Sequence, residues 1–202
     1  MFDTKLLITL LLCMLVMVLF TGSYKLFSSR RKAVKPQTPS IQSGDAKNPE
    51  EFMLLAADSL RANRFSKARD LARTGLKMNP QDKRTRANLL NLIGNTLAAT
   101  GATEKAFRHF RDSVRTDATF AFPHGNLGNI YFMRQEYERA EEEFKTALKL
   151  NPQYPDAHSN LGILYKSQKK YDLAEQSFST ALELDPQLKV ARENLEAIQK
   201  LR

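Results

Sequence analysis

Asparagine recurs through the carboxyl-terminal half of the chain at a fixed interval. Asn126, Asn160 and Asn194 are equally spaced in the sequence, and Asn95 and Asn129 form a further pair with the same spacing. An asparagine side chain offers both a donor and an acceptor, so a row of them can hold the main chain of an extended peptide. The row predicts a peptide-binding site. The alternative is a passive surface, which keeps asparagine because it is soluble and compatible with a helix.

The sequence offers no set of residues suited to catalysis. Of its three histidines, His109, His124 and His158, the last two are separated by the interval of the asparagines, so a repeat explains them without a metal site. No Gly-rich phosphate loop, no His-x-x-x-His or Cys-x-x-Cys pair, and no nucleophile with a base and an orienting group is found. The three glutamates 141–143 are interpreted as surface. We therefore expect no enzymatic activity, no metal site and no cofactor.

The same 34-residue interval also governs the small and aromatic residues, which indicates two consecutive repeats at 121–154 and 155–188. Asn126-Leu127-Gly128-Asn129-Ile130-Tyr131 corresponds to Asn160-Leu161-Gly162-Ile163-Leu164-Tyr165, and Ala140, Phe144, Ala147 and Pro152 correspond to Ala174, Phe178, Ala181 and Pro186. The small residues predict two helices that approach closely. The aromatic residues fill the gap to the next helix, and each proline ends the second helix of its unit.

The pattern Leu-Gly-x-x-Tyr, Ala-x-x-x-Phe-x-x-Ala and Pro resembles the tetratricopeptide (TPR) repeat, a helix-turn-helix unit that stacks with its neighbours. The resemblance implies an all-α, right-handed superhelix whose first helices line a concave groove. It places Asn126, Asn160 and Asn194 in this groove, with Asn129 and Asn95 widening the polar strip.

The asparagine row resembles the ladder in the helical-repeat portion of the glycosyltransferases that modify proteins with N-acetylglucosamine. Leu92 interrupts the row one unit earlier. Some TPR proteins grip chaperone tails with Lys and Arg, but the corresponding groove positions here hold Met53, Ala57, Gly125, Phe122 and Val190. The resemblance therefore does not extend to binding of chaperone tails.

Two degenerate units precede the clear ones, at residues 49–82 and 87–120, and an amphipathic capping helix follows at 189–202. The step between the two degenerate units is longer than the repeat interval, because four extra residues lie around Gln81 to Arg86. An insertion of this size adds about one helical turn. The globular part of the chain is thus predicted as one helical domain, residues 49–202.

The amino terminus predicts a membrane anchor. After a short head, residues 1–5, the segment 6–24 is nineteen residues long and mostly apolar, close to the lower limit of about 17 to 20 for a transmembrane helix. A cleaved signal peptide is the main alternative, since the apolar core is short and small residues follow it. Burial within the domain is a third interpretation, disfavoured because the repeats close their own core.

A basic linker, residues 25–48, follows the apolar segment and is expected to be flexible. Its early basic residues are Lys25, Arg30, Arg31, Lys32 and Lys35. Positive charge after the span favours a cytoplasmic domain, with a periplasmic or secreted domain as the alternative. The cluster serves topology and solubility, or additionally contacts anionic lipid headgroups.

Net charge is uneven along the chain, at +9 overall. Residues 1–48 carry seven basic and two acidic side chains, 49–120 carry thirteen and eight, and 121–202 carry eleven and twelve. Lys105, Arg108, Arg111 and Arg115 recur on one helix face, either as a solvated surface or as a contact for acidic lipid or an acidic partner. Nucleic acid is a poor candidate, because no aromatic stacking platform accompanies these residues.

These features together predict a membrane-tethered adaptor or scaffold that recruits a protein partner in its groove. An exported assembly factor for a secretion, pilus or outer-membrane machine is the second hypothesis. A self-assembling scaffold, in which copies of the chain stack on one another, is the third.

Overall fold

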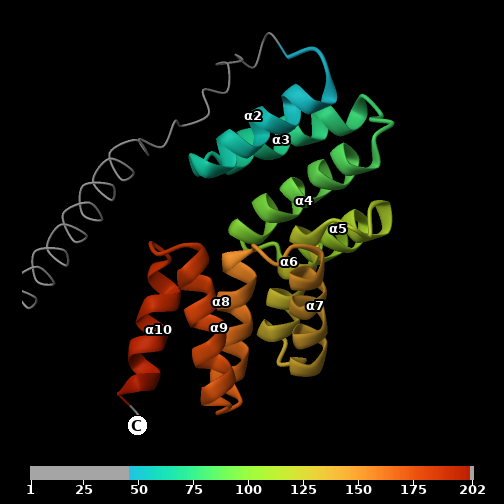
Figure 1. The fold of residues 1–202 in the computed structure, drawn as a ribbon. Coiled ribbons are helices and arrows are strands. Elements are labelled where there is room, and N and C mark those ends of the chain that lie inside the picture. The colour runs from blue at the N-terminus through green and yellow to red at the C-terminus, as the bar shows by residue number, and fades with distance from the viewer. Residues whose placement is uncertain (1–45, 201–202) are drawn as a thin grey trace, which may run out of the picture. The chain divides into compact units, whose positions relative to one another are not determined.

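The structure is a computed structural model that describes residues 46–200, and these residues are helical without any strand. The helices are α2 (Pro49–Arg61), α3 (Phe65–Lys77), α4 (Lys83–Ala99), α5 (Thr103–Thr116), α6 (Ala121–Met133), α7 (Tyr137–Leu150), α8 (Pro155–Ser167), α9 (Tyr171–Leu184) and α10 (Lys189–Gln199). Figure 1 shows them as consecutive hairpins, α2 with α3, α4 with α5, α6 with α7 and α8 with α9, followed by α10. The prediction of an all-helical repeat fold is confirmed for this part of the chain.

The predicted head, span and most of the basic linker lie outside the described residues. Within residues 46–200, no helix is long and apolar enough to cross a bilayer. The span at 6–24 therefore stays a prediction. Residues 42–202 form a compact unit of their own.

The helices of the two clear repeats begin and end in the same register. Helices α6 and α8 each have 13 residues and start exactly one repeat interval apart, and α7 and α9 each have 14 residues with the same offset. Helix α10 begins one further interval after α8 and occupies the place of another first helix. Equal spacing of the buried residues thus produces equal helices.

The four extra residues between the first two units lengthen a helix. Helix α4 has 17 residues against 13 in α2, and it begins at Lys83, four residues before the predicted unit start at 87. The Asp82 carboxylate accepts a hydrogen bond of 2.6 Å from the Thr85 backbone amide and caps the added turn. This bond is the main reason that the pKa of Asp82 lies below its usual range.

The core of the second, third and fourth hairpins contains a phenylalanine ring packed against a glycine. Phe144 on α7 is 1% exposed, and a Cβ added to Gly128 on α6 would lie 2.6 Å from its ring. Phe178 and Gly162 repeat this contact, at 2.7 Å, in the next hairpin. The close approach predicted from small residues is thus present, but the partner of each glycine is the phenylalanine ring of the second helix.

The first helices lie on the inner side of the stack. Helix α2 contacts α4, α6 contacts α8, and α8 contacts α10, whereas no comparable contact joins successive second helices among the described elements. Since the side on which successive units approach most closely is the inner side, we define the inner face as the one formed by α2, α4, α6, α8 and α10.

Candidate functional site

The inner face carries a row of side-chain amides, and Asn126 is its best-connected member. The Asn126 Nδ2 group on α6 donates hydrogen bonds of 2.9 Å to Asn91 Oδ1 and 2.9 Å to Asn95 Oδ1, both on α4. Both of its donor hydrogens are therefore used to join two units. Only Asn126 Oδ1 is left to accept a hydrogen bond from a ligand.

Asn194, at the equivalent place on α10, is also engaged within the protein. Its Nδ2 group donates to the Val190 carbonyl at 2.8 Å, and its Oδ1 accepts from Lys166 Nζ on α8 at 2.8 Å. It thus links α8 with α10. The three equivalent asparagines share a position on successive first helices but do not bond to one another.

Asn129 and Asn160 differ from these two residues. Both are partly buried, and within residues 46–200 neither side chain makes a hydrogen bond. Their amides keep a donor pair and an acceptor for an external group. Of the predicted site residues, these two are the ones whose side chains make no hydrogen bond within the described domain.

Asn91 is an inner-face residue that the sequence analysis missed. Leu92 was expected to interrupt the asparagine row, and it is indeed buried at 6% exposure, but Asn91 beside it is 5% exposed and bonds to Asn126. The row therefore continues into α4 one position earlier. The four-residue spacing of Asn91 and Asn95, which places both on one helix face, was the available signal.

One face of α6 combines these amides with apolar side chains. Phe122, Asn126, Asn129 and Met133 lie at steps of four, three and four residues and so share a single stripe of the helix. Phe122 is 43% exposed and Met133 is 62% exposed. The stripe offers apolar contact at its two ends and amides between them.

An aromatic cluster surrounds Phe122 at the start of α6. Its ring centroid lies 5.4 Å from that of Phe120 and 4.9 Å from that of Tyr154. Gly125 makes room for Tyr154, since a Cβ there would lie 3.0 Å from the Tyr154 ring. Burial, with a smaller contribution from the Asp156 charge, raises the pKa of Tyr154 to about 12. The cluster is thus a neutral, mostly apolar surface.

The glutamates 141–143 were interpreted as surface, and the structure modifies this interpretation. Tyr165 donates to Glu141 at 3.0 Å, and His124 Nδ1 lies 2.7 Å from Glu143 Oε2, while Glu142 is exposed. His124 itself is 8% exposed. Two of the three glutamates therefore fasten α7 to its neighbours.

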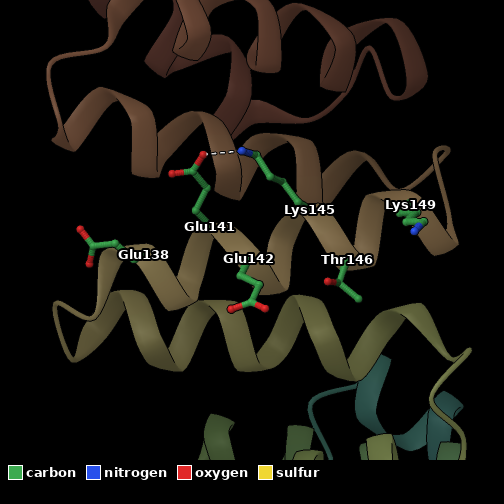
Figure 2. A pocket seen from close by; sticks show the side chains of 6 residues that line it. All are labelled: Glu138, Glu141, Glu142, Lys145, Thr146 and Lys149. Carbon is green, nitrogen blue, oxygen red and sulfur yellow. Dashed lines mark ion pairs between the residues drawn. The ribbon is translucent and has the colours of Figure 1, made fainter.

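A shallow depression of about 410 Å³ lies on α7, lined by Glu138, Glu141, Glu142, Lys145, Thr146 and Lys149. Figure 2 shows Glu141 and Lys145 turned toward each other, and their side chains are 2.6 Å apart. The bond to Lys145 lowers the pKa of Glu141, and the bond to Glu141 raises the pKa of Lys145. Both groups stay charged at neutral pH, so the pair is not poised for acid–base chemistry. Among the described residues, no three His, Cys, Asp or Glu side chains converge to hold a metal ion.

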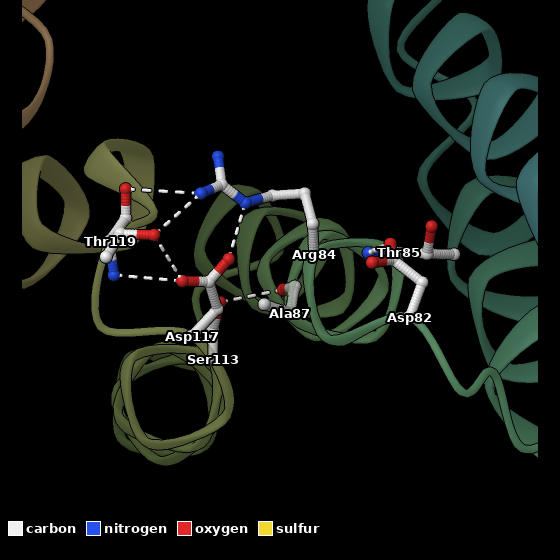
Figure 3. Close-up of polar contacts among 7 residues, drawn as sticks. All are labelled: Asp82, Arg84, Thr85, Ala87, Ser113, Asp117 and Thr119. Carbon is white, nitrogen blue, oxygen red and sulfur yellow. Dashed lines mark hydrogen bonds and ion pairs between the residues drawn. The ribbon is translucent and has the colours of Figure 1, made fainter.

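A polar clasp, made by Arg84, Asp117 and Thr119, holds the connection between α5 and α6 (Figure 3). Arg84 Nε donates to Asp117 Oδ2 at 2.5 Å, and the same guanidinium donates to Thr119 Oγ1 at 2.9 Å. It also lies 5.0 Å from the centroid of the Phe120 ring. The hydrogen bond from Thr119, followed by that from Arg84, lowers the pKa of Asp117. Because Arg84 stands in the added turn of α4, this turn fixes the segment that leads into the aromatic cluster.

Comparison with protein-family models identifies the repeats. A model described as TPR repeat matches residues 128–169, and one described as tetratricopeptide repeat matches residues 155–188. No curated protein sequence matches this chain significantly. Residues 128–188 thus match models of the tetratricopeptide repeat.

Solved structures share the fold. The crystal structure of MamA is 24% identical with a TM-score of 0.56, over 72% of this chain and 83% of that chain. The first TPR domain of Spaghetti (RPAP3), bound to the HSP90 peptide SRMEEVD, is 24% identical with a TM-score of 0.55. The match covers 58% of this chain and 94% of that chain. The second TPR domain of human RPAP3, in complex with the HSP70 peptide SGPTIEEVD, is 26% identical with a TM-score of 0.50. The match covers 56% of this chain and 98% of that chain. The described residues therefore have the fold of a TPR-like helical solenoid.

Proposed function

We propose, from the premise that residues 128–188 are tetratricopeptide repeats, that the protein is an adaptor that binds a protein segment on its inner face and holds it at a membrane. The observation that carries the binding proposal is the pair of unengaged amides, Asn129 and Asn160, on successive first helices. Two similar TPR domains are bound to peptides, which supports this class of ligand.

The chemistry of the inner face favours an extended segment with apolar side chains. Asn129 and Asn160 would bond to its main chain, while Phe122 and Met133 would contact its side chains. The expected clamp positions Met53, Ala57, Gly125, Phe122 and Val190 carry no charge, and Lys166 is engaged by Asn194. This does not favour an acidic chaperone tail.

Membrane tethering is the second part of the proposal, and it is supported by the sequence. The apolar segment 6–24 is long enough for a bilayer, and the basic residues 25–35 after it favour a cytoplasmic repeat domain. A tether raises the effective concentration of even a weak partner at the membrane.

Capture of the partner tests the binding site. The full chain with a carboxyl-terminal tag is cross-linked in its own cells and purified, and the captured proteins are quantified by mass spectrometry. The double variant Asn129→Ala/Asn160→Ala should capture about tenfold less partner, since each lost hydrogen bond contributes about 0.5–1.5 kcal/mol. The control Gln176→Ala removes an exposed amide from the second helix α9 and should leave capture unchanged. Equal capture by the double variant and the wild type would overturn the inner-face site.

Alkaline carbonate extraction tests the tether. The full chain should remain with the membrane pellet, and a variant that lacks residues 6–24 should be released. A reporter that is active on one side only, fused to the carboxyl terminus, then reports topology, and activity outside the cytoplasm would instead support an exported assembly factor. Release of the full chain by carbonate would refute tethering while leaving the peptide site standing.

A further inference from the structure

The second helices of the four hairpins carry a graded charge. Helix α3 has four basic side chains and one acidic side chain, and α5 has four basic and two acidic. Helix α7 has three basic and four acidic side chains, and α9 has three acidic side chains and no basic one. The net charge of the second helices thus changes sign from the amino-terminal hairpins to the carboxyl-terminal ones. The first helices show no such ordered change, since α2 has a net charge of −2 and α4 of +3, while α6, α8 and α10 each have no net charge.

The basic end of this gradient is exposed and mostly unpaired. The exposed cations of α3 and α5, which we call the basic face, are Lys67, Arg73, Lys77, Lys105, Arg108, Arg111 and Arg115. Within residues 46–200, one cation of the basic face forms an ion pair, namely Arg115 with Asp112 at 3.5 Å. The remaining cations form no ion pair within residues 46–200, and Arg111 lies 5.7 Å from the centroid of the Phe107 ring.

The positive charges of α3 and α5 contribute to the same local electrostatic field. Burial lowers the pKa of His109 on α5, Asp112 opposes this shift, and the charge of Arg73 on α3 lowers the pKa further. Both helices pack against α4, so they lie on the two sides of the same helix. On α5, Lys105, Arg108 and Arg115 fall within one face of the helix.

We propose that the basic face of α3 and α5 docks on the anionic headgroups of a lipid bilayer and sets the orientation of the repeat domain. This inference rests on the proposed membrane tether. The basic face belongs to the hairpins that follow directly after the predicted span and its basic linker. Only 24 residues separate the predicted span from α2, so the proposed tether would confine these hairpins near the bilayer.

The same charges make the orientation unique. Anionic headgroups attract α3 and α5 and repel α9, which carries Asp172, Glu175 and Glu183 without any basic residue. Helix α9 is therefore the second helix least attracted to the lipid. Helices α3 and α5 carry none of the large exposed apolar side chains of the described domain, although Met78 directly follows α3. The contact is accordingly electrostatic and sensitive to salt.

Vesicle sedimentation tests the docking without the tether, because residues 42–202 form a compact unit with its own core. Phosphatidylcholine vesicles with phosphatidylserine should bind the domain, and pure phosphatidylcholine vesicles should not. The variant Lys105→Gln/Arg108→Gln should lower the partition constant about 30-fold, since each cation near an anionic surface contributes about fivefold. The control Lys149→Gln/Lys200→Gln removes the same charge from other exposed positions and should change it little. Circular dichroism verifies that each variant is folded.

The full chain in proteoliposomes gives a second measurement. Acetylation of Lys67, Lys77 and Lys105 should slow when phosphatidylserine is present, while acetylation of Lys149 and Lys200 should not.

Two outcomes overturn the docking. One is a failure of the domain to bind phosphatidylserine vesicles, or an equal loss of binding in the control variant. The other is tighter binding to single- or double-stranded DNA of matched charge, which would assign the basic face to a nucleic acid. If the domain binds phosphatidylserine vesicles but carbonate releases the full chain, the proposed tether is wrong and the proposed lipid-binding role of the basic face is retained. If the full chain stays in the membrane pellet after carbonate extraction and the domain does not bind phosphatidylserine vesicles, the docking proposal alone is wrong.

Discussion

Asn126 on α6 donates its amide to the Oδ1 of Asn91 on α4 over 2.9 Å, so that one polar contact joins two repeats inside the proposed peptide site. Asn91 is 5% exposed and depends on partners within the protein. The asparagines of the inner face therefore divide into those that bond to a neighbouring repeat and those that make no hydrogen bond within the described domain.

This division predicts different stabilities for two equivalent alanine variants. Asn126→Ala should lower the free energy of unfolding by about 1–3 kcal/mol, because the buried amide of Asn91 loses a partner. Asn160→Ala should change it by less than about 0.5 kcal/mol, since its side chain makes no hydrogen bond within the described domain. Urea unfolding followed by circular dichroism measures both values. Equal losses in the two variants would contradict the assigned contacts.

The contact between Gly128 and Phe144 predicts that alanine is harmful in the middle of α6. Alanine is the better helix former by about 1 kcal/mol, yet its Cβ would lie 2.6 Å from the Phe144 ring. Gly128→Ala should therefore lower the free energy of unfolding by about 1–3 kcal/mol through overpacking. Adding Phe144→Leu should recover part of this loss in a double-mutant cycle. A stabilised Gly128→Ala variant would refute the close contact.

The turns within the hairpins carry a correctable backbone strain. Gln135 and Lys169 have φ values of 61° and 60° where the second hairpin has Gly101 at 80°. Left-handed geometry costs a non-glycine residue about 1–2 kcal/mol, so Gln135→Gly and Lys169→Gly should each raise the midpoint of thermal unfolding. Gly101→Ala should lower it, although a Cβ there would meet no atom within 4 Å. Shifts in the opposite directions would show that packing, and not backbone geometry, controls these turns.

The polar clasp predicts a loss of stability in acid. Asp117 has a lowered pKa, caused first by Thr119 and then by Arg84, so its stabilising effect is present above the ordinary carboxyl value of 3.8. This contribution is lost as the pH falls through the lowered pKa. The wild type should lose more unfolding free energy than Asp117→Asn when urea titrations are repeated at decreasing pH. Parallel pH profiles for the two proteins would exclude Asp117 as the source.

Tyr154 predicts a loss of stability in alkali. Its pKa is raised from 10.0 to about 12, so the neutral phenol stabilises the fold fully below pH 10 and this contribution is lost as the pH rises toward 12. The maximum difference is about 3 kcal/mol, at 1.36 kcal/mol for each pKa unit. Tyr154→Phe should show a weaker decline over this range, and phenolate absorbance in the folded wild type should show a late-titrating tyrosine. Identical declines in both proteins would refute the burial of this phenol.

Much of the fold follows from local spacing. The equal interval of Gly128 with Gly162, and of Phe144 with Phe178, predicts helices of equal length and register, because each position needs the same contact within its own hairpin. The longer step between the first two units likewise predicts an extra turn, which lies at the start of α4. These properties depend on residues near one another in the chain, so the sequence by itself determines them.

The polar contacts of the inner face were decided only by the tertiary structure. Asn126, Asn160 and Asn194 have the same repeat position, yet the first bonds to two asparagines, the second to none in the described domain, and the third to Lys166 and its own helix. Each side chain meets whatever the preceding first helix presents. That is Asn91 and Asn95 before Asn126, but Gly125 and Asn129 at the corresponding positions before Asn160. A repeat pattern specifies a residue's place within its own unit, whereas the hydrogen bonds of an amide depend on the neighbouring unit, where the pattern tolerates any side chain that fits.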